Sequence, residues 1–406
     1  MPPLCHDDER SALLQFKESR ISNDFYASKF DCRPTMASWK PEEGNVDCCS
    51  WDGVHCNKNT GHVIKLDLSH SCLFGSINSS SSLSKFFGEL PISMGNLGSL
   101  KELDLSQNGY FVLTKATSNT TSQKLKYIGL RSCNLTKFPN FLQNQHHLLV
   151  LDLSDNRIHG KVPKWLLDPN MQNLNALNIS HNLLTGFDQH PVVLPGNKGD
   201  LLTFDLSSNN LQGPFPVPPP GTIHYLASNN NLTGEIPSWI CNLNILESLV
   251  LSHNNLSGLL PQCLGNFSNE LSVLDLQGNN FFGTVPNTFI KERRIPRSLI
   301  NCSKLEFLGL GNNQISDTFP SWLGTLPNLN VLILRSNIFY GIIKEPRTDC
   351  GFSKLRIIDL SNNRFTGTLP SKSFLCWNAM KIHRNYRMDS GEVGNAAKGN
   401  KEEEET

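Results

Sequence analysis

Apolar and polar positions along the chain repeat with a period close to 24 residues. From residue 61 the pattern is LxxLxLxxNxLxGxIP, which returns as HLLVLDLSDNRIHGKVP at 147–163 and as SKLRIIDLSNNRFTGTLP at 353–370. A repeat of this length predicts a solenoid, because one copy cannot bury its apolar edge alone and stacked copies can. Aligned on their second leucine position, the copies fall at 66, 103, 128, 151, 177, 204, 225, 249, 274, 308, 332 and 358.

Each part of the repeat predicts a piece of local structure. The alternation in LxLxx predicts a short strand with its leucines inward and its x residues outward, so stacked repeats give an α/β fold with a parallel sheet on the concave face. The following Asn can donate and accept hydrogen bonds in a buried turn. The Gly of LxG permits a tight bend, and the Pro of IP ends the strand. The Asn column comprises Asn108, Asn156, Asn182, Asn209, Asn230, Asn254, Asn279, Asn313, Asn337 and Asn363.

Two intervals between neighbouring copies are longer, at 37 and 34 residues. They contain FFGELPISMGNLGSL (86–100) and RIPRSLINCSKL (294–305), each of which reads as the second half of a repeat without its strand. We interpret both as incomplete repeats that have lost an internal segment, with loops bulging from the solenoid as the alternative. The sequence therefore predicts a solenoid of about 12 strands over residues 61–382.

The N-terminal residues do not follow the repeat. DDERSALLQFKESR predicts a short helix, with Asp7 or Asp8 as N-cap and an apolar face that includes Leu13 and Phe16. We expect residues 1–60 to form a small cap over the open end of the first repeat.

Composition excludes several classes of function. The formal net charge is +0, with 36 basic and 36 acidic residues, so nothing draws the whole chain to nucleic acid or an anionic membrane. No apolar run reaches the roughly 18 residues of a membrane helix, and no apolar leader follows the first residues. Phosphate-loop, zinc-protease, hydrolase and kinase motifs are absent, so we expect no enzyme, cofactor or metal. The polar, acidic tail at 383–406 is expected to be disordered.

Twelve cysteines indicate an oxidising compartment. CCSWDGVHC is typical of a disulfide-bonded cap, because adjacent cysteines cannot easily share one zinc ion, although zinc and free thiols are alternatives. Cys241 and Cys263 lie in adjacent repeats at nearby phases, which makes them candidates for a bridge, with unpaired thiols as the alternative. Cys72, Cys133 and Cys302 are interpreted as small apolar substitutes in the Asn column or the core. Glycosylation sequons favour secretion and begin at Asn78, Asn119, Asn134, Asn178, Asn231, Asn255, Asn266 and Asn301.

The repeat LxxLxLSxNxLxGxIPxxLxxL is similar to the plant-specific class of leucine-rich repeats. The head CHDDERSALLQFK with SWKPEEGNVDCCSWDGVHC resembles the cap of plant receptor-like proteins of the disease-resistance type. Phrases such as EIPSWICN, LPQCLGNFS and FLCWNAMK extend the resemblance over about residues 4–382. It implies an ectodomain on the outer side of the plasma membrane that senses a microbial or endogenous peptide or protein and signals, in defence, through a co-receptor kinase.

The resemblance carries further expectations. It implies cap disulfides Cys5–Cys48 and Cys49–Cys56, which leave Cys32 without an obvious partner and the fates of Cys350 and Cys376 open. The chain lacks the family's leader, its final repeats and its membrane helix, so we expect a truncated ectodomain. A secreted polygalacturonase inhibitor, which shares the repeat and cap, and a non-functional truncated gene product are the alternatives.

Ligand binding in such a solenoid should use the outward residues of the concave strands. The repeated aspartates of LDL are explained by repeat phase as solvated strand residues, not as paired catalytic carboxylates. Less repetitive outward residues are better ligand-binding candidates, because aromatic residues and arginine are over-represented in binding hot spots; each could also be a plain exposed strand residue. The candidates are Tyr127, Arg131, His181, His224, His253, Phe307 and Arg335. A glycan on Asn178 would block this face.

Overall fold

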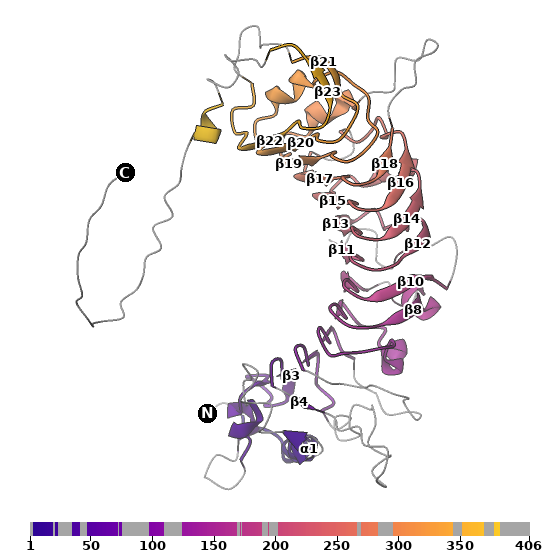
Figure 1. The fold of residues 1–406 in the computed structure, drawn as a ribbon. Coiled ribbons are helices and arrows are strands. Elements are labelled where there is room, and N and C mark those ends of the chain that lie inside the picture. Colours follow the sequence, from indigo (N-terminus) through magenta and orange to yellow (C-terminus); the bar gives the residue numbers. More distant parts are fainter. Residues whose placement is uncertain are drawn as a thin grey trace, which may run out of the picture.

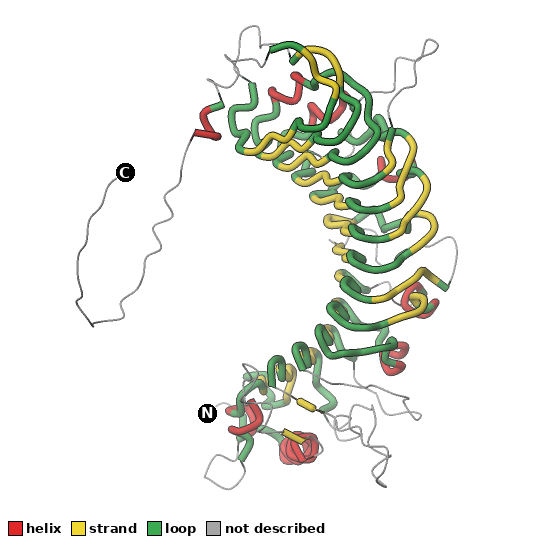
Figure 2. Tube along the Cα trace, viewed as in Figure 1, coloured by secondary structure: helices red, strands yellow, loops and turns green. Residues whose placement is uncertain are grey.

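The chain winds into an open arc of stacked coils, with the cap at one end (Figure 1). One sheet lines the concave side of the arc, and a second line of short strands follows its outer side (Figure 2). The computed structural model describes residues 3–18, 21–22, 35–40, 47–71, 73–74, 97–108, 124–168, 171, 173–188, 194, 202–265, 269–282, 295–343, 351–368 and 377–381.

The concave sheet has thirteen strands. Its first strand, β2, belongs to the cap and runs antiparallel to β3, and the other twelve run parallel in chain order. The strands are β2 (Val54–Cys56), β3 (Val63–Asp67), β5 (Glu102–Asp104), β6 (Tyr127–Gly129), β7 (Val150–Asp152), β9 (Ala176–Asn178), β11 (Leu202–Asp205), β13 (Thr222–Leu226), β15 (Ser248–Val250), β17 (Val273–Asp275), β19 (Phe307–Gly309), β20 (Val331–Ile333) and β22 (Ile357–Asp359).

The register of this sheet follows the alignment of the repeats. Leu66 pairs with Leu103, and the same alignment position pairs at every later step up to Leu332 and Ile358. These inward residues form a continuous apolar core through the stack. The predicted leucine-rich-repeat solenoid with a parallel concave sheet is therefore confirmed.

The outer strands are short and mostly parallel. They are β8 (His159–Val162), β10 (Leu183–Phe187), β12 (Gln212–Pro214), β14 (Asn231–Gly234), β16 (Asn255–Gly258), β18 (Asn280–Phe281), β21 (Tyr340–Ile342) and β23 (Arg364–Thr366). A small antiparallel pair joins β1 (Ile21–Ser22) and β4 (Leu73–Phe74). The 3₁₀ helices are η1 (Thr35–Ser38), η2 (Cys48–Ser50), η4 (Asn140–Asn144), η5 (Lys164–Leu167), η7 (Ser238–Asn242), η8 (Arg297–Asn301), η9 (Ser321–Thr325) and η10 (Asn378–Lys381).

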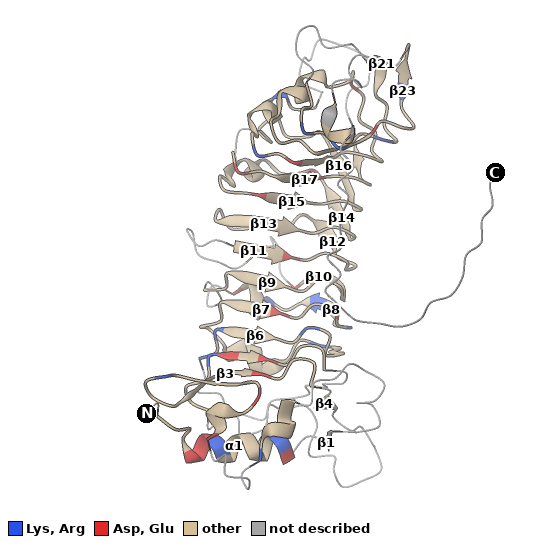
Figure 3. Cartoon of the chain, turned by 90° about the vertical axis from the view of Figure 1, so that its left-hand side faces the viewer, with Lys and Arg blue, Asp and Glu red and all other residues tan. Residues whose placement is uncertain are grey.

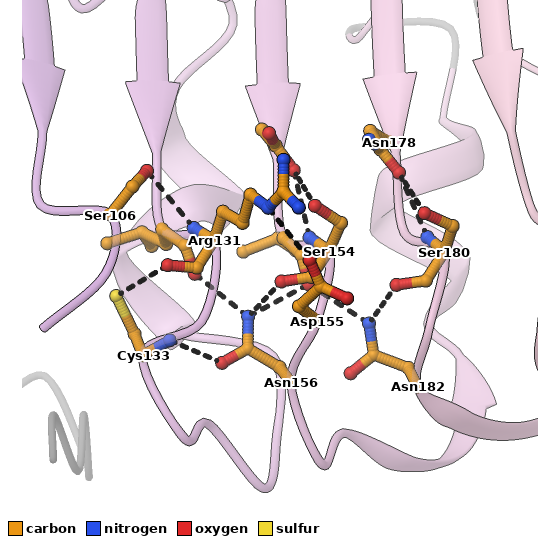
Figure 4. Close-up of polar contacts among 12 residues, drawn as sticks. Ser106, Arg131, Cys133, Ser154, Asp155, Asn156, Asn178, Ser180 and Asn182 are labelled. Carbon is orange, nitrogen blue, oxygen red and sulfur yellow. Dashed lines mark hydrogen bonds and ion pairs between the residues drawn. The ribbon is translucent and has the colours of Figure 1, made fainter. Parts of the chain in front are cut away.

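The Asn column satisfies the backbone between neighbouring repeats, as predicted. At Asn156, Oδ1 accepts the Leu135 N–H at 2.9 Å, a bond with a counterpart at each other Asn of the column, and also the Cys133 N–H at 3.0 Å. Its Nδ2 donates to the carbonyls of Leu130 and Leu153 at 2.8 and 2.9 Å (Figure 4). Each amide thus ties its own repeat to the preceding one, which spares buried peptide groups from remaining unpaired.

The turn before each Asn requires a left-handed backbone. The residue four positions after the aligned core position has φ between 53° and 63° in all twelve repeats. Only Gly278 is a glycine at this position; elsewhere residues such as Asp155 and His253 adopt it. A left-handed φ costs a non-glycine residue about 1–2 kcal/mol, so the hydrogen bonds on both sides of the turn must hold it.

The cap contains the helix α1 (Asp7–Glu18), which buries Leu13 and Phe16. Asp7 is its first helical residue, so Asp7 and Asp8 lie inside the first turn and are not the N-cap. Glu9 is buried, and its carboxylate accepts the Val63 N–H at 3.0 Å, which ties the helix to the first solenoid strand.

Disulfides join Cys5 to Cys48 and Cys49 to Cys56 in the cap, with Cα atoms 5.4 and 5.5 Å apart. A third bridge joins Cys241 to Cys263, whose Cα atoms are 5.7 Å apart, in adjacent repeats. These are the pairs expected from the sequence. Cys32, Cys72, Cys350 and Cys376 lie outside the described residues.

Two buried cysteines remain as thiols. Cys133 occupies an Asn-column position, and its Sγ donates to the Leu105 carbonyl at 3.1 Å, whereas Cys302 follows η8 in the core. Burial raises the pKa of Cys133 from 9.0 to about 12 and that of Cys302 from 9.0 to about 11. Both are small core residues, as interpreted from the sequence.

The two long intervals do not interrupt the sheet. β3 pairs directly with β5, and β17 pairs directly with β19. In the second interval η8 occupies the place of a regular 3₁₀ helix, and the buried Asp317 accepts the Ile295 N–H at 3.2 Å at its start. Residues 75–96 and 283–294, which hold most of the rest of both intervals, lie outside the described residues, as does the tail from 382. The division of the chain at residues 60 and 382 stays a prediction.

Candidate functional site: the concave strand face

Twelve parallel strands lie side by side across the concave side of the arc (Figure 3). Their outward side chains form one surface there. Each strand contributes the residue before the aligned core position, called here the −1 column, and the residue after it, called the +1 column. In-register pairing places members of one column side by side on neighbouring strands, about 4.8 Å apart. Residues far apart in sequence therefore become neighbours on this face.

Aspartates of the +1 column cap the turns that follow the strands. Asp152 Oδ1 accepts both the Ser154 N–H at 2.9 Å and the Ser154 hydroxyl at 2.6 Å. Asn178, which stands in the same column, accepts the same two bonds from Ser180 at 3.0 and 2.7 Å (Figure 4). The interpretation of these aspartates as merely solvated strand residues was therefore incomplete: one oxygen has a structural role, and the negative charge is not required for it.

Three ligand-binding candidates lie on strands, in the −1 column. Tyr127, His224 and Phe307 are half-buried on β6, β13 and β19. The Tyr127 hydroxyl donates to Asp104 Oδ2 at 3.2 Å. Burial and the neighbouring Asp104 raise the pKa of Tyr127, so its hydroxyl is a neutral donor at physiological pH.

The two arginine candidates lie just beyond their strands and are paired. Arg131 Nε contacts Asp155 Oδ2 of the next repeat at 2.7 Å (Figure 4). Arg335 Nη1 lies 3.9 Å from Asp359 Oδ2, a looser contact. The Ser361 hydroxyl bond is the main cause that lowers the pKa of Asp359, and Arg335 contributes. Both arginine side chains remain about half exposed, at 52% and 50%.

The two histidine candidates occupy turns and not strands. His181 and His253 are the exposed left-handed residues before Asn182 and Asn254. The His253 ring lies over Gly278 of the next repeat, where an added Cβ would come within 2.6 Å of Nδ1. The seven candidates are thus spread from β6 to β20, and those in the same or adjacent repeats are Tyr127 with Arg131, His224 with His253, and Phe307 with Arg335.

Aromatic rings accompany the two glycines of the +1 column. Tyr127 precedes Gly129, and Phe307 precedes Gly309, by two positions on the same strand. A Cβ on Gly309 would lie 2.8 Å from Phe307 Cε1, so the ring leans along its own strand over the glycine. The Phe307 ring thereby lies low on the concave face.

An apolar band on this face was missed by choosing candidates by residue type. Leu226 and Val250 adjoin in the +1 column, because β13 and β15 pair in register. Farther along the solenoid, apolar residues of the −1 column continue the band on β17, β19, β20 and β22. The last of them, Ile357 on β22, is 55% exposed. These −1 residues are Val273, Phe307, Val331 and Ile357, and Ile333 adjoins them in the +1 column. The sequence contains a signal for this band, because the positions that alternate with the inward leucines of each strand point outward and are apolar in these repeats.

The sequons fall on different surfaces. Asn231 and Asn255 begin β14 and β16 on the outer side and are exposed, as is Asn301 at the end of η8. Asn178 lies on the concave face, and Asn134 lies in a left-handed turn. Asn78, Asn119 and Asn266 lie outside the described residues. Glycosylation stays a prediction for all of them.

The sulfur atoms of Cys5, Cys48 and Cys49 lie within 4.8 Å of one another, the one grouping of possible metal ligands among the described residues. All three belong to disulfides, so no thiolate is available there to hold an ion.

Models of known families match the N-terminal residues and several of the repeats. The leucine rich repeat N-terminal domain matches residues 6–57. Leucine rich repeat models match residues 303–365 and also 147–168, 223–243, 246–267 and 270–291. Receptor-like protein 35 of Arabidopsis thaliana is 40% identical over 260 residues, which cover 61% of this chain and 26% of that protein. Receptor-like protein 54 of the same plant is 41% identical over 269 residues, which cover 63% of this chain and 32% of that protein.

The chain belongs to the plant leucine-rich-repeat receptor-like proteins. It spans about a third or less of the length of these relatives. Among solved structures, the receptor-like chain is similar to PEPR1–AtPEP1, with a TM-score of 0.63 and 25% identity over 91% of this chain and 54% of that one. It is also similar to a TDR receptor, with a TM-score of 0.55 and 29% identity; the match covers 79% of this chain and 55% of the receptor chain. Among the described residues, no helix is both long and apolar enough to cross a bilayer.

Proposed function

We propose that the chain is the ligand-recognition part of a receptor-like protein, and that its concave strand face binds the ligand. The observation that carries this proposal is the row of in-register outward side chains, which includes aromatic, charged and apolar residues on one accessible surface. A solenoid offers such an extended concave surface by construction. The relatives that are named receptor-like proteins support the same role.

The finer proposal is perception of a microbial or endogenous peptide or protein at the outer side of the plasma membrane. In it, a co-receptor kinase engages the whole receptor, and the response is defence. The disulfides in the cap and between adjacent repeats support an extracellular location, because such bonds persist in oxidising compartments. A separate test compares binding of the chain to microbial culture filtrates and to host extracellular extracts; binding confined to host material would reject microbial perception.

A glycan wedge tests whether the concave face is the binding surface. Val250→Asn creates an Asn-Leu-Ser sequon in the middle of the concave sheet, with Leu251 and Ser252 unchanged. Leu183→Asn creates an Asn-Leu-Thr sequon on the outer strand β10, where Leu183 is 50% exposed. The secreted wild-type chain would be used to select binders from a phage-displayed library of random 12-residue peptides. Both glycosylated variants would then be assayed against the selected peptides.

We expect the wedge at residue 250 to reduce binding at least tenfold and the wedge at residue 183 to leave it within twofold. Mass spectrometry of the secreted chains confirms that each added sequon is occupied. Peptides that bind both variants equally well, or a library that yields no binder, would reject the concave face as a peptide-recognition surface.

A further inference from the structure

The +1 column of the second half of the solenoid alternates between carboxylates and apolar residues. Reading from β11 to β22, in-register neighbours are Asp205, Leu226, Val250, Asp275, Gly309, Ile333 and Asp359. Carboxylates therefore recur at every third strand. Between them lie first Leu226 with Val250, and then Gly309 with Ile333, the latter pair beside the ring of Phe307.

The charges of Asp205 and Asp275 are not paired with a basic side chain among the described residues. Asp205 accepts a bond at Oδ1 from the Ser207 N–H at 3.0 Å, and Asp275 accepts at Oδ1 from Gln277, at 3.2 and 3.0 Å. The capping role needs only one oxygen and no charge, as Asn178 demonstrates. The second oxygen of each is left to face a partner.

Asp359 differs from them, because Arg335 lies near it. The basic residues at the strand starts, such as Lys101 and Lys126, lie at the margin of the sheet, beside the first half of the solenoid. Between β11 and β17 the +1 column of the concave face therefore presents carboxylates separated by apolar side chains. Its natural complement is a chain that alternates basic and apolar side chains with the same spacing.

An extended peptide that crosses the strands has this spacing. Three steps between neighbouring strands span about 14 Å. Four residues of an extended chain, at about 3.4 Å each, also span about 14 Å, and residues i, i+2, i+4 and i+6 point to one side. A basic residue at i above Asp205 places i+2 over Leu226 and Val250, i+4 above Asp275, and i+6 over Gly309, Ile333 and the Phe307 ring.

We propose that the concave face from β11 to β20 binds an extended peptide with basic side chains at i and i+4 and apolar side chains at i+2 and i+6. This inference rests on the proposed function and names the class of ligand. The apolar side chains of the peptide bury the apolar band, and the two charge pairs determine which peptide residue lies over which strand. A peptide shifted by one residue turns all four side chains away from the sheet.

Two synthetic peptides of equal composition test the spacing. The first is Ser-Lys-Ser-Leu-Ser-Lys-Ser-Phe-Ser. In the second, Ser-Lys-Ser-Leu-Lys-Ser-Ser-Phe-Ser, the lysines are three residues apart and point to opposite sides of an extended chain. Fluorescence anisotropy with the secreted full chain at low salt measures both affinities. We expect the first peptide to bind at least tenfold more tightly, and its affinity to fall as salt is raised.

Variants of the chain test the contacts. Asp275→Asn keeps the cap and removes the charge, so we expect at least a fivefold loss of affinity for the first peptide. Glu102→Gln neutralises a carboxylate of the same face on β5, outside the proposed site, and creates no glycosylation sequon, so it should leave the affinity within twofold. With the second lysine of the peptide replaced by glutamine, Asp275→Asn should cause no further loss. Ile333→Ser tests the apolar contact independently and should weaken binding at least threefold.

Equal binding of the two peptides, or equal effects of Asp275→Asn and Glu102→Gln, would overturn the proposal. Unaltered circular dichroism of the variants excludes misfolding as the cause of a loss. The glycan-wedge experiment uses a library without this pattern. Library peptides that lose binding to the chain glycosylated at residue 250, but lack basic residues at i and i+4, would therefore support the proposed function and contradict this inference.

Discussion

At the scale of the residue, one amide per repeat holds neighbouring repeats together. Asn209 is representative: Oδ1 accepts the Leu184 N–H at 3.1 Å, and Nδ2 donates to the carbonyls of Ile179 and Leu206 at 3.0 and 3.2 Å. The sequence was sufficient to predict this role, because an Asn that recurs after ten of the twelve strands needs a common structural reason, and its amide can both donate and accept hydrogen bonds. The left-handed turn before it was not predictable from residue type, since His70, Ser208 and Asp155 share that conformation.

Replacing Asn209 by Ala should lower the free energy of unfolding by at least about 2 kcal/mol, because buried donors and acceptors lose their partner. Urea denaturation followed by circular dichroism measures the change. Asp275→Asn, which keeps its capping oxygen and creates no glycosylation sequon, is the matched control and should stay within about 0.5 kcal/mol. A loss no larger for Asn209→Ala than for the control would contradict the role assigned to the column.

The buried thiols give a pH-dependent prediction. Burial raises the pKa of Cys133 to about 12 and of Cys302 to about 11, from 9.0 in the exposed state. Below pH 9 both thiols are neutral in folded and unfolded chains; above it only the unfolded thiols ionise, so stability should fall as pH rises. At pH 8 iodoacetamide should label Cys133 and Cys302 only after denaturation, as read by peptide mass spectrometry. Rapid labelling of the native chain would show that these sites are accessible.

At the scale of the element, stability comes from contacts between adjacent repeats, since each short strand has little stability of its own. The strands were predictable because inward leucines alternate with outward residues and pair in register, as in Leu274 with Leu308 across the 34-residue interval. The site was less predictable. Aromatic residues and arginine could be selected by type, but the band of Leu226, Val250 and Ile333 appears only when the register places them together.

The Cys241–Cys263 bridge should stabilise its pair of repeats by constraining the unfolded chain. Its cysteines are 22 residues apart, and a closed loop of that length corresponds to about 3 kcal/mol. Urea denaturation of the double variant Cys241→Ala/Cys263→Ala, compared with the wild-type chain under non-reducing conditions, measures this contribution. A loss below about 1 kcal/mol would indicate that packing between the repeats already provides the constraint.

At the scale of the whole molecule, the arc presents one long surface whose chemistry changes along its length. Five carboxylates and one ammonium occupy the −1 and +1 columns of the first half, from β3 to β11, and most apolar outward residues lie in the second half. A peptide that crosses the strands from β11 to β20 would meet the apolar region and the last carboxylate of the charged region, whereas a ligand bound to the outer strands would meet neither. The central claim is therefore a claim about position: the ligand lies on the concave strands.

The crystal structure of the secreted chain with a peptide selected from the random library measures that position directly. The account predicts an extended peptide that crosses the concave strands between β11 and β22, with side chains on Leu226, Val250 and Phe307. A peptide bound along the outer strands, or on the cap, would contradict it.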